Sequence, residues 1–200
     1  ITSQPPHSAG VETKNNRNFP KKNNLILIFS IIGLTLFLIY FLNFNLLRQA
    51  TGIIRALKMN LTGEKEEIIL SQFEKTLKLH SGGKAETREE IVKIALGLTA
   101  PARVNNLTFI QKVIEETEKQ TKETSRDPKY FIFSGQLYNL SGKIRGNNQD
   151  FKKAILNFEN ALALSPRKQQ IYFGLSESYH LQNDLKKAQD FLRQTIYLEP

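Results

Sequence analysis

The chain contains no cysteine and no tryptophan among its 200 residues. Without cysteine it can form neither a disulfide framework nor a thiolate metal site, and the redox state of its compartment stays open. The sequence also lacks a glycine-rich phosphate loop, a nucleophile elbow and a catalytic pair of carboxylates. Its three histidines are far apart and have no carboxylate at metal-ligand spacing, so we expect them on the surface: His7, His80 and His180. These absences predict no catalytic residue, no cofactor and no metal.

The formal net charge of +9 is spread along the chain as single basic residues or pairs, mixed with acidic residues. This mixture is typical of solvated helix surfaces, and no cluster of basic and aromatic side chains indicates a nucleic-acid partner. We therefore expect no nucleic acid among the partners. The basic residues near the N-terminus are predicted instead to attract anionic lipid headgroups: Lys14, Arg17, Lys21 and Lys22.

One long segment has no charge, from Asn23 to Leu47, and its centre, Leu25–Leu42, is almost entirely apolar. A helix over that centre would be about 27 Å long, close to the thickness of the hydrocarbon layer of a bilayer. A signal peptide would have a shorter apolar core without the polar segment 1–23 before it, and a buried soluble helix is rarely apolar on every side. We predict a transmembrane helix over residues 24–47, preceded by a polar loop or tail over 1–23.

More basic residues lie before the predicted membrane helix than directly after it. Counted from the apolar centre Leu25–Leu42, Arg17, Lys21 and Lys22 lie within ten residues on the N-terminal side, whereas only Arg48 lies within the first ten on the other side. The positive-inside rule therefore favours residues 1–23 in the cytoplasm and the rest of the chain outside it.

The next segment, 48–126, is predicted to be a linker domain of amphipathic helices. In the second of these, Ile69, Phe73 and Leu77 recur every four residues, which places them on one face. Gly82 and Gly83 are expected to end that helix. The expected helices are Leu46–Asn60, Glu66–His80, Thr87–Leu98 and Leu107–Thr121.

The last 32 residues, 169–200, resemble one tetratricopeptide unit, a 34-residue pair of antiparallel helices. Large residues in this pattern fill the space between the two helices, and small residues let the helices approach. Here the large positions 4, 7, 11 and 24 are Tyr172, Leu175, Tyr179 and Leu192, the small positions 8 and 20 are Ser176 and Ala188, and Thr195 and Pro200 take positions 27 and 32.

Residues 128–166 resemble a second unit in the same register if seven polar residues, Ile144–Asp150, are inserted as a loop between its helices. The alternative is a generic antiparallel helical hairpin. The predicted fold class is therefore all-α: one transmembrane helix followed by an α-helical solenoid, with two units over 127–200. The matching residues are Phe131, Gly135, Tyr138, Ala154, Phe158, Ala161 and Pro166.

A helix pair of this kind cannot bury its apolar face alone, so pairs stack and present a surface for a protein or peptide partner. Exposed residues of the first helix of each unit would line the concave side. The predicted partner-binding residues, whose alternative is ordinary polar surface, are Gln136, Asn139, Gln170, Glu177 and His180.

Most of the chain also resembles the C-terminal part of bacterial O-antigen ligase or polymerase membrane proteins that carry a tetratricopeptide tail. The similar segments are Tyr40–Asn45, Gly82–Ile91 and Ser165–Tyr179. The resemblance implies a location in the bacterial inner membrane with the repeats outside the cytoplasm. It also implies an active site upstream of Ile1, and we expect the chain to be a piece of a longer polypeptide.

Two functions follow from these patterns. The first is a membrane-anchored tetratricopeptide module for protein–protein interaction, without a catalytic site of its own. The alternative is the accessory tail of an O-antigen ligase-like glycan transferase, and whether such a parent is an enzyme stays open at this point.

Overall fold

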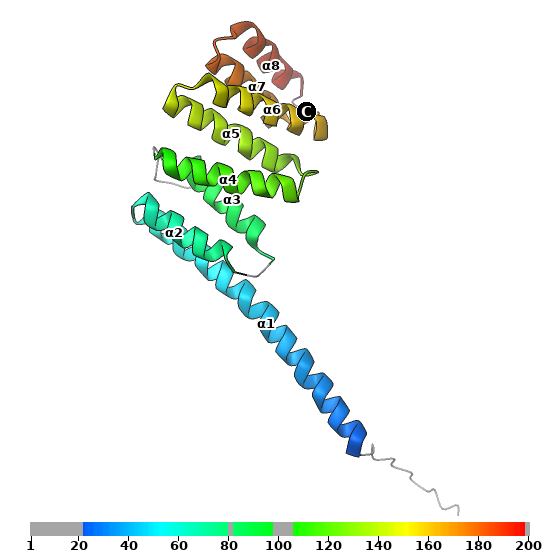
Figure 1. Cartoon of the computed structure of the whole chain (residues 1–200). Coiled ribbons are helices and arrows are strands. Elements are labelled where there is room, and N and C mark those ends of the chain that lie inside the picture. Colours follow the sequence, from blue (N-terminus) through cyan, green and yellow to red (C-terminus); the bar gives the residue numbers. More distant parts are fainter. Residues whose placement is uncertain (1–21, 80–81, 98–105, 199–200) are drawn as a thin grey trace, which may run out of the picture. The chain divides into compact units, whose positions relative to one another are not determined.

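The computed structural model describes residues 22–79, 82–97 and 106–198, and in these residues it has eight α-helices and no strand (Figure 1). The predicted all-α fold is confirmed. The chain divides into two compact units, 1–41 and 42–200, which are described separately. The predicted polar tail falls outside the described residues except for its last two, as do His7 and His80.

The first unit contains the beginning of α1 (Lys22–Leu61). Every side chain from Asn24 to Phe41 is exposed, although most of them are apolar. Thr35, a polar residue in this segment, donates its hydroxyl to the carbonyl of Ile31 at 2.8 Å. By length and hydropathy this is one helix that could cross a membrane, with a mean hydropathy of 2.8 over its most apolar window.

In the second unit, the end of α1 is followed by α2 (Glu66–Leu77), α3 (Lys84–Ala95) and α4 (Leu107–Glu123). The glycine pair does not end α2 as expected, because α2 already ends at Leu77 and Gly83 is the residue just before α3. Gly83 is buried, and a methyl group there would come within 3.0 Å of the Gln49 side chain. The glycine therefore lets Gln49 of α1 pack against the start of α3.

Four later helices begin at side chains that cap them: α4, α5 (Pro128–Arg145), α6 (Asn148–Leu164) and α8 (Leu185–Tyr197). The cap oxygen in each accepts a backbone N–H of the first turn, which would otherwise lack a partner. The caps are Asn106, Asp127, Asn147 and Asp184. The helix between α6 and α8, α7 (Gln169–Leu181), has no side-chain cap.

From α4 to α8, each helix packs against the next, and α7 also packs against α5. Figure 1 shows α5 to α8 as successive layers of a stack. Large apolar side chains fill the core of the second unit and are almost completely inaccessible to water: Phe73, Ile91, Phe109, Ile110, Leu137, Phe158, Ile171 and Leu175.

The seven inserted residues, Ile144–Asp150, of the predicted tetratricopeptide unit 128–166 do not form a loop. They lengthen both helices, so that α5 has 18 residues and α6 has 17, and the turn consists of Gly146 and Asn147 alone. The added turns pack against each other because Ser141 donates a hydrogen bond to the buried Asp150 at 2.8 Å. Gly142 also leaves room for the ring of Phe151, with which a methyl group would overlap.

Candidate partner-binding groove on the last two helices

One aromatic ring shows how a helix stacks on the pair before it. The ring of Phe158 in α6 is fully buried between two glycines, Gly135 of α5 and Gly174 of α7. A methyl group on Gly135 would come within 2.7 Å of the ring, and a methyl group on Gly174 would overlap it from the other helix. Because both glycines lack a side chain, α7 packs directly on the α5–α6 pair.

Polar contacts hold α7 in register on this pair. Ser178 donates its hydroxyl to Oδ1 of Asn139 at 3.0 Å, and Lys143 donates to Oε1 of Glu177 at 2.6 Å. The first contact buries Asn139, which is 2% exposed. The sequence-based expectation that Asn139 is an exposed concave residue is therefore wrong, because α7 covers it.

The corresponding positions of the last pair, α7 and α8, are uncovered in the part of the chain that the structure describes. In the shared register, Phe173 corresponds to Ile132, His180 to Asn139 and Leu192 to Phe158. The three residues of the first pair are at most 2% exposed, whereas Phe173 is 48% exposed, Leu192 is 46% exposed and His180 is also exposed. The face that receives α7 on one pair is thus open on the next.

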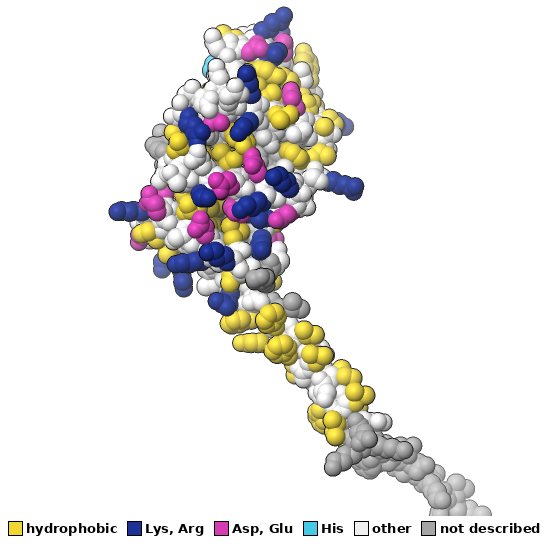
Figure 2. All heavy atoms as spheres, in the orientation of Figure 1, with side chains coloured by type: hydrophobic (Ala, Val, Ile, Leu, Met, Phe, Trp, Pro, Cys, Tyr) yellow, Lys and Arg dark blue, Asp and Glu magenta, His cyan; other side chains and the backbone are white. Residues whose placement is uncertain are grey.

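This open face is hollowed. A cavity of about 500 Å³ lies between α7 and α8, and Figure 2 shows hydrophobic side chains among charged ones at that end of the second unit. We call this cavity the α7–α8 groove. Apolar side chains of both helices line it together with polar groups of α7 and Gln189 of α8. The lining residues are Phe173, Ser176, Glu177, His180, Leu185, Ala188, Gln189 and Leu192.

The packing between α7 and α8 confirms one part of the predicted unit and corrects another. Ser176, a predicted small residue, donates its hydroxyl to the carbonyl of Ala188 at 2.8 Å, so the helices do approach at these positions. However, Phe191 rather than Leu192 fills the space between the helices. Its ring stacks on Tyr179 with centroids 5.5 Å apart. Leu192 points into the groove because position 24 packs against the following helix, as Phe158 does.

The structure brings two of the five predicted partner-binding residues into the groove, Glu177 and His180. Gln170 is exposed elsewhere on α7, and Gln136 is half-buried on α5. Oε1 of Gln136 is buried without a hydrogen-bond partner in the described residues. Sequence reasoning missed Phe173 and Leu192, although comparing equivalent positions of the two units could have identified them.

A second group of polar contacts lies away from the groove, around Arg88 on α3. Arg88 is buried and donates to Glu116 at 3.2 Å, to Gln120 at 2.7 Å and to Glu123 at 2.7 Å, all on α4. Burial raises the pKa of the Glu116 carboxyl, but hydrogen bonds from Lys119 and Arg88 outweigh it, so this pKa lies below its usual range. These contacts join α3 to α4. Among the described residues, no cluster of His, Asp or Glu side chains could hold a metal ion.

Comparison with known proteins supports the repeat assignment over part of the chain. A family model described as Tetratricopeptide repeat matches residues 148–200, which include α6, α7 and α8. No curated protein matches the chain. The similarity thus covers the last predicted unit and the second helix of the unit before it, whereas the assignment of α5 to a complete first unit stays a prediction.

Proposed function

We propose that this chain is a membrane-anchored interaction module whose α7–α8 groove binds an amphipathic helix of a partner protein. The observation that carries the proposal is the difference between equivalent residues. Phe158 is fully buried under α7, whereas its counterpart Leu192 is 46% exposed in a groove of similar construction. Tetratricopeptide repeats generally act by binding other proteins, which agrees with the matched family.

The contacts of α7 indicate what such a partner helix should contain. Gly174 faces the Phe158 ring, and four residues later Ser178 reaches Asn139. A helix in the groove would therefore need a small residue opposite Leu192 and, one turn later, a hydroxyl or amide group opposite His180. Apolar residues on the same face would cover Phe173, as is usual for helices that bind in grooves.

Photo-crosslinking from single positions in the full chain tests this proposal. A photoreactive residue at Phe173 or Leu192 should label the same partner in the native membrane, whereas one at the exposed Lys152 of α6 should not. Leu192→Asp should abolish labelling from Phe173, because it places a charge in the apolar floor of the groove. Equal labelling from all three positions would contradict the proposal.

Membrane anchoring is supported by the charge-free segment 23–47 and by the exposure of its apolar side chains. An anchored chain should remain in the membrane pellet after extraction with alkaline carbonate, and a variant with Leu25–Leu42 replaced by a polar sequence should be released. The absence of native cysteine permits a clean test of orientation. A Lys152→Cys variant should react with an impermeant maleimide on intact cells if the repeats lie outside the cytoplasm, as the charge distribution predicts.

The alternative, an accessory tail of an O-antigen ligase-like membrane protein, rests on the resemblance of Tyr40–Asn45, Gly82–Ile91 and Ser165–Tyr179. In that case the groove would position a partner or substrate near an active site upstream of Ile1. The coding sequence before Ile1 separates the two: several further apolar spans in frame would favour the tail, and a start codon within a few residues would exclude it.

A further inference from the structure

We propose that the cavity between the end of α1 and α2 binds the phosphate group of an anionic phospholipid. The residues that would hold it are Arg48, Arg55 and Lys75. The inference rests on the membrane anchoring proposed above but is independent of the α7–α8 groove. It concerns the second unit alone, because every residue that lines the cavity follows Leu42.

The cavity forms where two helix faces cross. Arg48, Gly52 and Arg55 lie on one face of α1, and Gln72, Lys75 and Thr76 lie on one face of α2. A methyl group on Gly52 would overlap the side chain of Thr76, so the glycine allows the two helices to approach there. Around this crossing point a hollow of about 380 Å³ remains open.

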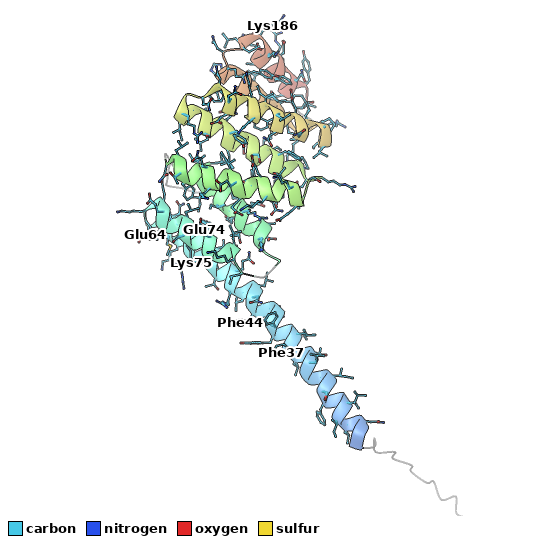
Figure 3. All side chains as sticks on the ribbon, in the orientation of Figure 1. Phe37, Phe44, Glu64, Glu74, Lys75 and Lys186 are labelled. Carbon is cyan, nitrogen blue, oxygen red and sulfur yellow. The ribbon has the colours of Figure 1, made fainter. Side chains whose placement is uncertain are left out.

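The charge of this hollow has one sign. Its lining contains three cations and no carboxylate, and the ion pairs found in the described parts of the chain all use other basic residues. Glu74, the sequence neighbour of Lys75 on α2, lines a different cavity with Arg88. Figure 3 labels both Glu74 and Lys75 on α2. Three cations that line one hollow without a carboxylate among them repel one another, and a bound anion would relieve that repulsion.

The other polar groups of the lining already have partners. Thr51 donates to the carbonyl of Leu47, Thr76 donates to the carbonyl of Gln72, each at 2.8 Å, and the Gln72 amide donates to the carbonyl of Gly52 at 3.5 Å. The donors left to a ligand are therefore the ammonium of Lys75 and the guanidinium groups of Arg55 and Arg48, the last of which also lies over the Phe44 ring, 5.7 Å from its centroid. A ligand with several negatively charged acceptor oxygens and few donors fits this set, and phosphate is such a group.

The position of the cavity in the chain favours a lipid over a free phosphate. Arg48 follows Leu42, the last residue of the apolar centre, by six residues, a distance of at most about 20 Å in any conformation. The headgroup layer lies within that reach of the hydrocarbon boundary. Two apolar side chains precede the cavity on α1: Phe44, labelled in Figure 3, is 42% exposed and Leu46 is 52% exposed. Leu47, which lines the cavity, is 65% exposed, and acyl chains could cover all three.

The test uses the full chain in a mild nonionic detergent, with phosphatidylglycerol as the probe and native mass spectrometry to count bound lipid. The variant combines Arg48→Gln, Arg55→Gln and Lys75→Gln. The matched control combines Lys152→Gln, Arg167→Gln and Lys186→Gln, which removes the same charge from exposed positions on α6, α8 and the loop before α7. Circular dichroism verifies that both variants remain helical.

We expect one phosphatidylglycerol to stay bound to the wild type and to the control, and phosphatidylcholine not to replace it. Each removed cation should weaken binding about fivefold, so the triple variant should bind on the order of a hundredfold more weakly. Equal loss in the control would overturn the proposal in favour of non-specific attraction. Displacement by millimolar inorganic phosphate would overturn the assignment to lipid. The triple variant should still resist carbonate extraction, so failure here is distinguishable from failure of the anchor.

Discussion

The Phe158 ring in α6 lies directly against the backbone of Gly174 in α7, and Gly135 of α5 closes the other side of the same ring. The ring therefore cannot move away from one helix without colliding with the other. This arrangement makes the stacking of α7 on the α5–α6 pair sensitive to a single methyl group.

We expect Gly174→Ala to destabilise the second unit, although alanine favours helix formation by about 1 kcal/mol over glycine. Overpacking a filled core costs about 1–3 kcal/mol, and Phe158 has no free space to move into. The net loss should be up to about 2 kcal/mol, measured by chemical unfolding of the full chain in detergent. Gly82→Ala is the control, because a methyl group there meets nothing within 4 Å. A Gly174→Ala protein at least as stable as the wild type would show that α7 is not packed as described.

The hydrogen bonds from Arg88 to Glu116, Gln120 and Glu123, which we call the Arg88 cluster, predict a second effect on stability, at the junction of α3 and α4. Arg88→Met should cost about 2 kcal/mol, because Gln120, which is buried, loses a partner, Glu123 loses its cation and Glu116 keeps only Lys119. Arg88→Lys should recover only part of this loss, since one ammonium cannot reach all three acceptors. Lys112→Met, which removes the exposed pair with Glu115, should cost less than about 0.5 kcal/mol. Equal effects of the Arg88 and Lys112 substitutions would contradict the structure.

The stability of the second unit should fall in acid because two carboxyl groups have lowered pKa values. Burial raises the pKa of Glu89, but the hydrogen bonds from Lys129 and Lys93 lower it by more, so the net shift is downward. The pKa of Glu116 is lowered in the same way by Lys119 and Arg88. A group whose pKa is lower in the folded chain stabilises the fold above its unfolded pKa, about 4.3, and this contribution is lost as the pH falls through the folded pKa.

We therefore expect an unfolding temperature that changes little between pH 6 and pH 8 and falls below about pH 4. Glu116→Gln should make the acid decline shallower, and adding Glu89→Gln should make it shallower again. Differential scanning calorimetry over this pH range measures both effects. An unchanged decline in the double variant would mean that other groups cause it.

The helix starts of the second unit were the part of the fold most open to sequence reasoning. Asp127 followed by Pro128 indicates a helix start, and α5 begins there because cap and backbone bond within a few residues. The prediction of a loop at Ile144–Asp150 is wrong because the contacts that exclude it are made between two helices and not within a few residues of sequence. A polar segment with Gly146 and Asn147 is compatible with a long loop, and only the Ser141–Asp150 and Gly142–Phe151 contacts between the helices show that both continue.

The Arg88 cluster could not be predicted, since its partners lie 28 to 35 residues away in sequence. The many charged residues of 115–129 are typical of a solvated segment, yet Thr117 and Gln120 within it are buried and Glu116 bonds Arg88. Charge composition does not show which charges face another helix. The groove was half predictable: Glu177 and His180 follow from the repeat register, but the exposure of Leu192 depends on the absence of a covering helix in the described residues.

The contrast between Phe158 and Leu192 provides the last prediction. Both occupy the same position of their units, so a purely structural role would make both substitutions costly. Phe158→Ala should cost about 3–5 kcal/mol, because it empties a fully enclosed site between three helices. Leu192→Ala should cost less than about 1 kcal/mol, since nearly half of that side chain already meets water. Unfolding measurements in detergent test both values, and crosslinking from Phe173 tests binding in the same proteins. If Leu192→Ala is nearly neutral in stability yet lowers partner labelling, Leu192 acts in binding. If it destabilises the chain as strongly as Phe158→Ala, another part of the protein covers the groove, and the proposed docking of a partner helix there is wrong.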